Sequence, residues 1–321
     1  MSASTSPLES SVRVAVVQAG AVPFDREACV AKAERLIGDA AGRSARVVVF
    51  PEAFIGGYPK GLDYGLVVGA RDPAGREEFR LSLESAVAVP GPDTARLGAA
   101  AAAHGCYLVM GAIERDGGTL YCTALFFGPD GTLLGLHRKL MPTALERMIW
   151  GFGDGSTLTV VDTPYGPLGA VICWENYMPL LRTAMYAKGV ALYCAPTADD
   201  RDTWLPTMRH IALEGRCFVL SACQVLRKRD FPSTVRVSLG DGPDALLMRG
   251  GSAIVGPLGQ VLAGPCFGEE TILTADLDLH DLGRGKFDFD AVGHYARPDV
   301  FQLIVNEAPA RPVTSRPPGG G

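Results

Sequence analysis

The sequence predicts an α/β fold organised as a single domain. Short apolar runs of strand length alternate with segments of helical periodicity, and turn residues separate them. The chain has 321 residues, 47% hydrophobic and 20% charged, which is enough apolar material to bury a sizeable core. Polar, glycine-rich segments at residues 56–72 and 227–250 interrupt the pattern. Neither resembles a linker between independent cores, so we interpret both as insertions into one domain.

The first third of the chain shows the alternation most clearly. Residues 12–17 form a short apolar run followed by turn residues, which is typical of a buried strand. Residues 26–41 place small and aliphatic side chains on one face with helical spacing. Residues 46–50 are a second apolar strand, residues 92–103 predict a helix, and residues 107–113 predict the next strand.

A hairpin follows these elements. Residues 120–127 and 132–136 flank the turn sequence Gly128-Pro129-Asp130-Gly131. The remaining expected elements are a strand at 168–172, a helix at 178–187, a strand at 190–194, a helix at 204–214, a strand at 218–222, a hairpin formed by 252–255 and 260–263, and a strand at 271–277. This order indicates βαβ units mixed with hairpins.

We expect the domain to span residues 12–305. Residues 1–11 are polar and carry neither the basic start nor the apolar centre of a signal peptide, so they are expected to be a disordered lead-in. Residues 306–321 are rich in proline and glycine and are expected to be a disordered tail.

Charge and hydropathy argue against several functional classes. The net charge of −5 disfavours nucleic acid and acidic membranes as partners. No apolar stretch approaches the roughly 20 residues that span a bilayer. The eight cysteines include no CxxC pair, so we expect free thiols in a cytoplasmic protein. The five histidines lack the spacing of metal ligands, and no metal site is expected.

The strongest chemical signal is a cysteine at the end of a strand. Residues 169–176 read GAVICWEN, so an apolar strand ends at Cys173 and a helix begins a few residues later. A nucleophile at such a turn lies at the end of the sheet, where backbone N–H groups can stabilise negative charge. The helix N-terminus is expected to lower the thiol pKa. Because free cysteines commonly act as core residues, this pattern alone leaves catalysis and inert packing equally open.

Two charged residues also follow predicted strands directly. Glu52 comes shortly after the predicted strand at residues 46–50. It is either a general base at the carboxyl end of a sheet, or a solvated loop residue or helix cap. Lys139 follows the first hairpin and is either a surface residue or the cation that holds a thiolate and a tetrahedral intermediate. For Glu146 with Arg147, the simplest interpretation is a surface ion pair.

Together these three segments resemble the nitrilase superfamily of carbon–nitrogen hydrolases, which use a Glu-Lys-Cys triad. Cys173 matches the nucleophile motif of the family, Lys139 its lysine motif and Glu52 its first-glutamate motif. The interval of 34 residues between Lys139 and Cys173 (173 − 139) agrees with the family pattern.

The sequence further resembles the nitrilase branch, over about residues 12–305. Residues Trp174, Glu175 and Asn176 after the cysteine favour a nitrilase over an amidase. The segments that carry the likeness are FPEAFIGGYPKGLD (50–63), HRKLMPTALERMIWGFGDGS (137–156), CWENYMPL (173–180), the stretch 195–224 with RHIALEGRCFVLSACQ, and GHYARPDVFQL (293–303).

The resemblance implies a four-layer αββα sandwich with two mixed β-sheets, and two such units packed as a dimer. It implies a nitrilase that hydrolyses an organic nitrile to the carboxylic acid and ammonia. In that reaction Cys173 is the nucleophile of a thioimidate and thioester pathway, with Glu52 and Lys139 as its partners. It implies no metal or organic cofactor.

The resemblance also suggests supporting residues. Glu146 matches a further family glutamate, expected to position Lys139 or the substrate. Trp174 and Tyr58 are expected to line the substrate pocket, although packing alone would explain them. His294 lies in the closing segment and either supports the site or is an ordinary surface histidine. The insertion at 227–250 implies a homo-oligomer, a dimer or something larger such as a spiral, and its alternative interpretation is a mobile surface loop.

Two other functions stay open at this point. An amidase or a cyanide-hydrating enzyme could carry the same triad and would differ in its product. A catalytically silent scaffold of the same fold is a different class, and the three intact triad positions argue against it.

Overall fold

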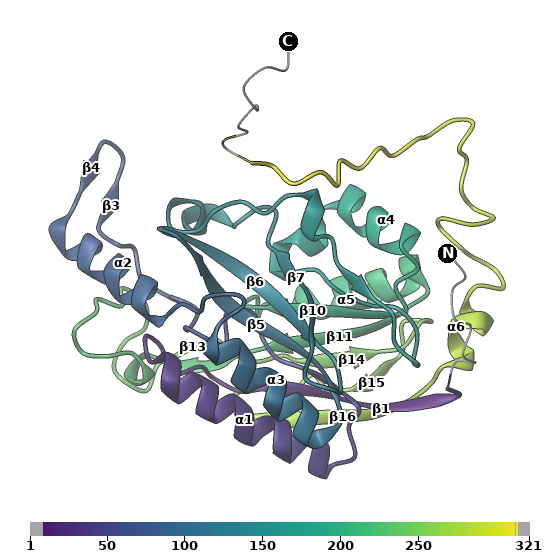
Figure 1. Ribbon diagram of the computed structural model, residues 1–321, viewed down its shortest axis with the longest axis horizontal. Coiled ribbons are helices and arrows are strands. Elements are labelled where there is room, and N and C mark those ends of the chain that lie inside the picture. Colours follow the sequence, from purple (N-terminus) through teal and green to yellow (C-terminus); the bar gives the residue numbers. More distant parts are fainter. Residues whose placement is uncertain (1–8, 312, 314–321) are drawn as a thin grey trace, which may run out of the picture.

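The computed structural model describes residues 9–311 and 313. Within this part of the chain, two six-stranded sheets lie face to face, and helices cover the outer face of each (Figure 1). Both sheets contain parallel and antiparallel pairs. The four-layer αββα sandwich that the resemblance implied is therefore confirmed.

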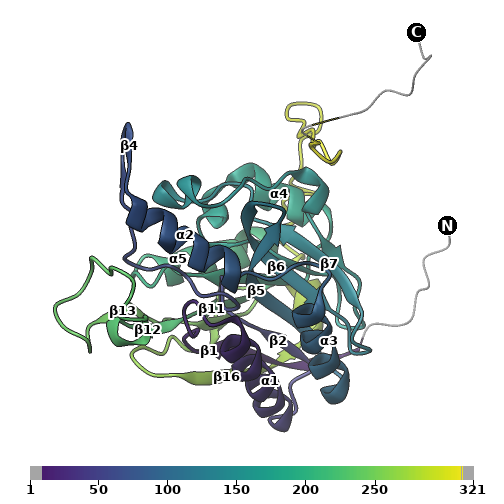
Figure 2. The same cartoon turned by 60° about the vertical axis from the view of Figure 1, so that its left-hand side comes forward.

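The first sheet has the order β16-β1-β2-β5-β6-β7. Its strands are β1 (Ser11–Gln18), β2 (Val47–Val49), β5 (Tyr107–Asp116), β6 (Thr119–Phe127), β7 (Leu133–Arg138) and β16 (Thr271–Asp278). Strands β1, β2 and β5 are parallel, and the β5-β6-β7 meander is antiparallel, so β7 runs in the same direction as β2. Helices α1 (Arg26–Gly42) and α3 (Pro92–His104) cover the outer face (Figure 2).

The second sheet has the order β15-β14-β11-β10-β9-β8. Its strands are β8 (Val160–Val161), β9 (Leu168–Ala170), β10 (Leu192–Thr197), β11 (Phe218–Cys223), β14 (Ala253–Val255) and β15 (Val261–Ala263). Strands β9, β10 and β11 are parallel. Helices α4 (Pro179–Ala187) and α5 (Trp204–Gly215) pack on the face turned away from the first sheet.

Strand alternation builds the two inner layers of the core. On β1, Val12, Val14 and Val16 join the cluster between the sheets, whereas Ala15 and Val17 join the cluster under α1 and α3. All five are buried. Side chains of successive strand residues point to opposite faces, so one apolar run supplies both layers. Burial of each valine stabilises the fold by about 1.5–3 kcal/mol relative to exposure.

Local signals account for the ends of the outer helices. The Asp25 side chain accepts a hydrogen bond from the Ala28 backbone N–H at 2.9 Å and caps the start of α1. Helix α3 ends at Gly105, which adopts a left-handed conformation with φ +58°. Asp25 lies where helical spacing begins in the sequence, and Gly105 lies where it ends.

The two segments interpreted as insertions contain regular structure that the sequence did not reveal. Residues 56–72 include β3 (Leu66–Val67) and β4 (Ala70–Arg71), and α2 (Pro73–Ser85) follows. In the second segment, β12 (Val225–Arg227) pairs with β13 (Leu246–Arg249), and the short 3₁₀ helix η4 (Lys228–Asp230) lies between them. The sequence predicted an insertion at 227–250 but not this two-stranded ribbon, because pairing of separated strands leaves no local periodicity.

The two insertions pack against each other at one end of the molecule (Figures 1 and 2). The backbone N–H and the hydroxyl of Ser238 both donate to the Gly61 carbonyl, at 2.8 and 2.7 Å. The Arg236 N–H donates to the Glu78 carboxylate of α2 at 3.2 Å. An apolar cluster lies beneath them, formed by Leu62, Tyr64, Ala198, Leu226, Phe231, Val235, Leu247 and Met248. These contacts fix the second insertion against the first.

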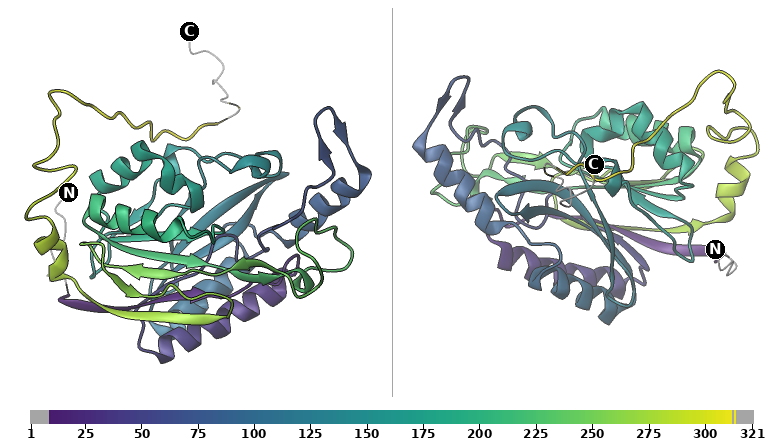
Figure 3. Two further views of the ribbon diagram at one scale, coloured as in Figure 1. Left: turned by 180° about the vertical axis from the view of Figure 1, so that it is seen from behind. Right: turned by 45° about the horizontal axis from the view of Figure 1, so that its top comes forward.

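The ends of the domain differ slightly from expectation. Ser11, assigned to the lead-in, is the first residue of β1, and residues 1–8 lie outside the described part. After α6 (His280–Gly285) the chain continues along the outside of the sandwich without further helix or strand (Figure 3). Residues 306–311 and 313 of the expected tail are exposed, and 312 and 314–321 are not described. Over the described residues, no helix combines the length and apolarity needed to cross a membrane.

Candidate active site

Glu52, Lys139 and Cys173 come together although they lie on different parts of the chain. Glu52 follows β2, Lys139 follows β7 directly, and Cys173 follows β9 as the first residue of the 3₁₀ helix η3 (Cys173–Tyr177). The strands before Glu52 and Lys139 run in the same direction in one sheet, whereas β9 belongs to the other. The site therefore lies where the carboxyl ends of strands from both sheets meet.

Two carboxylates hold the Lys139 ammonium. Its Nζ donates to Glu52 Oε1 at 2.7 Å and to Glu146 Oε2 at 2.8 Å, and all three side chains are buried. Glu146 also accepts from the Tyr58 hydroxyl at 2.5 Å and from the Thr143 N–H at 2.7 Å. The interpretation of Glu146 as one half of a surface ion pair was wrong, because the η1 turn (Ala144–Met148) directs this carboxylate inward.

The two oxygens of Glu52 have different surroundings. Oε1 accepts from Lys139 and from the Cys122 thiol, at 3.5 Å. Oε2 has no hydrogen-bond partner in the described part of the chain. Burial raises the pKa of Glu52 above its ordinary value, while the Lys139 charge acts in the opposite direction. Glu52 is thus a buried carboxylate with one oxygen available to take a proton.

The charge of Lys139 is secured by its anionic neighbours. Burial alone would lower its pKa, but the carboxylates of Glu52 and Glu146 outweigh that effect and raise the pKa well above the ordinary lysine value. The backbone N–H of Lys139 also donates a hydrogen bond to the Cys122 carbonyl oxygen at 2.8 Å, which fixes the backbone of Lys139 to β6. The side chain remains an ammonium and is a fixed positive charge inside the site.

Cys173 occupies an unusual backbone conformation. Its φ is +50°, in the left-handed region that residues with a Cβ adopt rarely. The Asn176 amide donates to the Cys173 carbonyl at 2.8 Å, and the Thr197 hydroxyl donates to the Cys173 thiol at 3.3 Å. The strained turn holds the thiol beside Glu52 closely enough that each group shifts the pKa of the other.

The expectation that a helix N-terminus would lower the thiol pKa was wrong. The pKa of Cys173 is raised to about 12, chiefly by burial and next by the Glu52 carboxylate. Only a short 3₁₀ turn starts at Cys173, and α4 begins later, at Pro179, so the thiol does not lie in the first turn of an α-helix. The resting residue is therefore a thiol, and its reaction requires a base.

A cavity of about 220 Å³ opens onto the thiol. It is lined by Tyr58, Lys60, Thr143, Glu146, Cys173, Trp174, Ala198, Asp199, Asp200 and Arg201. Both expected pocket residues, Tyr58 and Trp174, are among them. The Trp174 indole N–H donates to Asp199 at 2.8 Å, and the Arg201 guanidinium lies 4.8 Å from the centre of the indole ring. One wall of the cavity is therefore an aromatic ring held by an ion pair.

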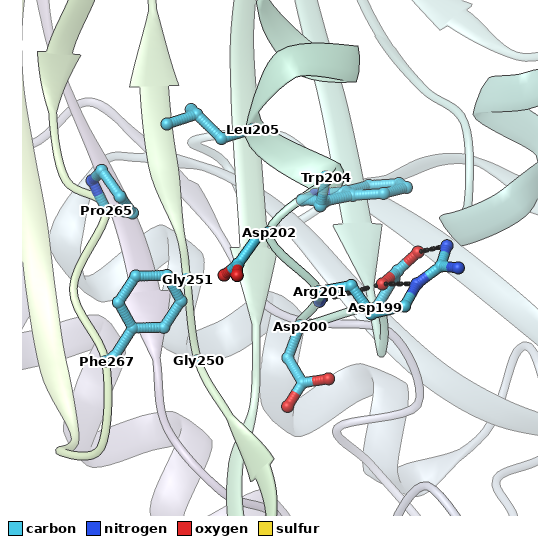
Figure 4. Close-up of a pocket in the computed structure, with 10 residues that line it drawn as sticks. All are labelled: Asp199, Asp200, Arg201, Asp202, Trp204, Leu205, Gly250, Gly251, Pro265 and Phe267. Carbon is cyan, nitrogen blue, oxygen red and sulfur yellow. Dashed lines mark hydrogen bonds and ion pairs between the residues drawn. The ribbon is translucent and has the colours of Figure 1, made fainter.

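A neighbouring hollow of about 160 Å³ shares Asp199, Asp200 and Arg201 with this cavity. Figure 4 shows the Arg201 guanidinium bonded to the Asp199 carboxylate on one side of this hollow, with Phe267 on the opposite side. The Asp199 and Arg201 pair thus borders both the thiol pocket and this second hollow.

The structure does not bring His294 to the site. Its side chain is exposed on the segment after α6 and packs edge-on against Tyr295, and it is not among the residues that line the Cys173 cavity. The physical reason is that this segment follows the outside of the sandwich, away from the strand ends that hold the triad.

Sequence reasoning missed several residues of the site. Thr197 ends β10, and Asp199 and Arg201 follow it, next to the strand that leads to Cys173. Polar residues directly after a buried strand were the signal that identified Glu52 and Lys139, and the same signal would have identified these. Cys122 has no such signal, because it lies inside β6 and touches Glu52 only through the fold.

Comparisons with known proteins agree with this geometry. The carbon–nitrogen hydrolase family model matches residues 13–287. The chain is 65% identical over 304 residues to an aliphatic nitrilase of Sinorhizobium fredii, which covers 95% of this chain and 98% of that protein. It is 58% identical over 308 residues to nitrilase 2 of Arabidopsis thaliana, covering 94% and 91%. A bifunctional nitrilase/nitrile hydratase of Lupinus angustifolius is 57% identical over 309 residues, covering 95% and 88%.

Solved structures share the fold at lower identity. An amidase from Nesterenkonia sp. aligns with a TM-score of 0.64 at 22% identity and covers 87% of this chain and 96% of that one. The NitFhit protein of C. elegans aligns with a TM-score of 0.71 at 22% identity, covering 95% and 70%. The chain is a hydrolase of carbon–nitrogen bonds: it belongs to the carbon–nitrogen hydrolase family, in the nitrilase branch that its sequence resembles.

Proposed function

We propose that this protein hydrolyses organic nitriles to carboxylic acids and ammonia, with Cys173 as the covalent nucleophile. The observation that carries the proposal is the buried Cys173 thiol beside the Glu52 carboxylate, one of whose oxygens has no hydrogen-bond partner among the described residues. The names of the relatives at 57–65% identity support the substrate class. The fixed charge of Lys139 beside both groups supports the chemistry.

In the first half of the reaction, Glu52 Oε2 takes the proton of the Cys173 thiol as sulfur attacks the nitrile carbon. Attack and proton transfer are coupled, because burial disfavours a free thiolate. The proton is delivered to the nitrile nitrogen, and Lys139 stabilises the negative charge that develops there. The product of this step is a thioimidate, in which sulfur is bonded to the former nitrile carbon.

In the second half, Glu52 activates a water molecule that adds to the thioimidate carbon. Ammonia leaves, and a thioester of Cys173 remains. A second water molecule cleaves the thioester to the carboxylic acid and restores the thiol. The sum is one nitrile and two waters converted to one acid and one ammonia, and no step requires a metal or an organic cofactor.

Glu146 acts through Lys139 in this scheme. Its carboxylate accepts hydrogen bonds from the Lys139 ammonium and from the Tyr58 hydroxyl at the same time, so it sets the position of both groups. Trp174 and Tyr58 both line the cavity onto which the thiol opens, and they limit the width of the substrate.

The test is a panel of aliphatic, arylaliphatic and aromatic nitriles, together with the corresponding amides. Acid, amide and ammonia are each quantified for every substrate. Nitrile hydrolysis predicts acid and ammonia in equal amounts. An amide as the main product would favour a nitrile-hydrating enzyme, turnover of amides alone would favour an amidase, and no turnover at all would favour a silent scaffold.

The same panel includes a chelator. Across the described residues, no group of three or more His, Cys, Asp or Glu side chains is arranged to hold a metal ion. EDTA is expected to leave the rate unchanged, whereas iodoacetamide is expected to abolish it. Activity that disappears with EDTA and returns with zinc would contradict the mechanism.

The pH profile is expected to show a displaced acid limb. Activity needs the Glu52 carboxylate, so it is present above the folded pKa of Glu52 and lost as the pH falls through that value. Since burial raises this pKa, the midpoint of the acid limb in kcat/KM should lie above about 4.3, the ordinary glutamate value. Rates from pH 4 to 9 in buffers of constant ionic strength measure it. A midpoint at or below the ordinary value would contradict the assignment of the base.

We further propose that the protein acts in the cytoplasm as a homo-oligomer, a dimer or a larger assembly such as a spiral. All eight cysteines are free and seven are buried, which suits a reducing compartment. The insertion between β12 and β13 supports assembly, because its exposed outer face is held in place by Gly61 of the first insertion and by Glu78 of α2. Repetition of a non-closing contact would extend a dimer into a spiral.

Shortening the insertion is expected to reduce both particle mass and activity. Residues 229–243 would be replaced by a Gly-Ser bridge, and mass would be measured by light scattering beside the nitrile rate. Activity should fall because the insertion packs on the cluster that contains Ala198 of the pocket. Ser238→Ala, which removes one bond to Gly61, is the control and should keep the parent mass. A shortened protein with unchanged mass and rate would show that the insertion is not an assembly element.

A further inference from the structure

A second buried carboxylate lies two residues after the nucleophile. Glu175 is fully enclosed, and the mechanism does not use it. Its Oε2 accepts from the Ile172 backbone N–H at 2.8 Å, and its Oε1 accepts from the Leu140 backbone N–H at 2.6 Å. Ile172 directly precedes Cys173, and Leu140 directly follows Lys139. A single carboxylate therefore joins the backbone beside the nucleophile to the backbone beside the cation.

The third partner of Glu175 is His137, which is also buried. The His137 Nε2 lies 3.0 and 3.2 Å from the two Glu175 oxygens, and its Nδ1 lies 2.9 Å from the Thr157 carbonyl oxygen. Both ring nitrogens face acceptors, so both must donate, and the ring is an imidazolium. Although burial lowers the pKa of His137, the Glu175 charge outweighs it and the pKa is raised. The result is a buried ion pair behind the site.

This pair reinforces the turn that needs support. Cys173 has a left-handed backbone, and the residues on either side of it must be held for that conformation to persist. Glu175 holds Ile172 on one side. Asn176 holds Val171 and Cys173 through their carbonyl oxygens, at 2.9 and 2.8 Å. Of the side chains described that hold this turn, Glu175 also reaches the strand end that carries Lys139, through the Leu140 N–H.

We propose that Glu175, held by His137, is a positioning residue that sets the distance between the Cys173 thiol and the Lys139 ammonium. It does not line the cavity, so it acts through the backbone of the two reacting segments. The inference rests on the proposed nitrile hydrolysis and deepens it. It predicts that loss of Glu175 lowers the rate of the chemical step more than the binding of the nitrile.

The decisive variant is Glu175→Gln. Because each oxygen accepts from a different backbone N–H, either orientation of the glutamine amide sets its NH₂ group against a donor. Displacement of the reacting segments is expected to lower kcat about 100-fold, with KM changed less than about threefold. His137→Gln keeps one donor but removes the charge, and a smaller loss of about 10-fold in kcat is expected.

Glu114→Gln is the matched control. Glu114 is a buried carboxylate on β5 that accepts a hydrogen bond from Arg138 at 2.6 Å and another from the Thr123 hydroxyl at 2.8 Å. Its partner Arg138 lies on β7, the strand that also carries His137. The described contacts give it no bond to the backbone beside Cys173 or Lys139. Loss of a buried ion pair should lower Tm in both glutamine variants, but only Glu175→Gln should lower kcat, measured well below either Tm.

Alkylation of Cys173 by iodoacetamide, followed by mass spectrometry, separates this inference from the proposed function. Glu175→Gln should slow alkylation about 10-fold relative to Glu114→Gln, whether or not the chosen nitriles are substrates. Equal kcat and equal alkylation in folded wild type and Glu175→Gln would overturn the inference, and so would an equal loss in Glu114→Gln. If Glu175→Gln does not fold, the His137→Gln variant provides the test. An unchanged kcat in His137→Gln would then overturn the inference.

Discussion

Replacement of Cys173 by alanine is expected to reduce nitrile hydrolysis by about 10⁴-fold or more, because the covalent pathway loses its nucleophile. The fold should survive, since the side chain is small and the Asn176 bond that holds this turn goes to the backbone carbonyl. Release of ammonia measures the rate, and far-UV circular dichroism checks the fold. Retention of nitrile hydrolysis by a folded Cys173→Ala protein would refute the central assignment.

Other buried cysteines provide matched controls for this prediction. Cys194 and Cys217 are fully buried in the packed core, and among the described residues neither thiol forms a hydrogen bond with a triad side chain. Alanine at either position should keep the rate within about threefold and cost about 1–2 kcal/mol in stability. Peptide mapping after iodoacetamide should find the label on Cys173 and on the partly exposed Cys266 in the wild type, and on Cys266 alone in Cys173→Ala.

Glu52→Gln and Lys139→Ala are each expected to lose nearly as much activity as the cysteine variant. Glutamine cannot take the thiol proton, and alanine removes the charge that stabilises the developing anion. Members of one catalytic unit do not contribute additively, so Glu52→Gln combined with Cys173→Ala should be no slower than Cys173→Ala alone. A combined variant that is slower by the product of the two losses would show that the two residues act in separate steps.

Stability distinguishes the two single variants. Lys139→Ala leaves the buried carboxylates of Glu52 and Glu146 without their cation, so it should cost about 3–5 kcal/mol in the free energy of unfolding. Glu52→Gln removes a charge that burial already disfavours, and Lys139 keeps its ion pair with Glu146. A much smaller loss in the free energy of unfolding is therefore expected. Urea denaturation measures both. Glu114→Gln, which should remain active, shows whether loss of any buried carboxylate is sufficient to abolish turnover.

Much of the architecture could be predicted from local sequence pattern. The apolar runs that became β1, β2, β5 and β11 are short, bounded by turn residues and buried on both faces. Such a run can be recognised as a buried strand from its own residues, because a continuous apolar strand must be covered on both faces wherever it lies in the fold. The four-layer arrangement was different: alternation was compatible with it, and only resemblance to a family implied it. The β12 and β13 ribbon was missed, since pairing across an insertion depends on contacts that are distant in sequence.

The candidate site divides in the same way. The sequence by itself determined which residue types stand at the ends of the strands, and therefore the identity of Glu52, Lys139 and Cys173 as candidates. Only the tertiary structure decided that Glu146 turns inward to Lys139 and that His294 stays on the surface. It also decided that the Cys173 thiol has a raised pKa. The physical reason is that burial and charge act through space: a carboxylate or a thiol takes its properties from neighbours that folding supplies, and those neighbours lie far from it along the chain.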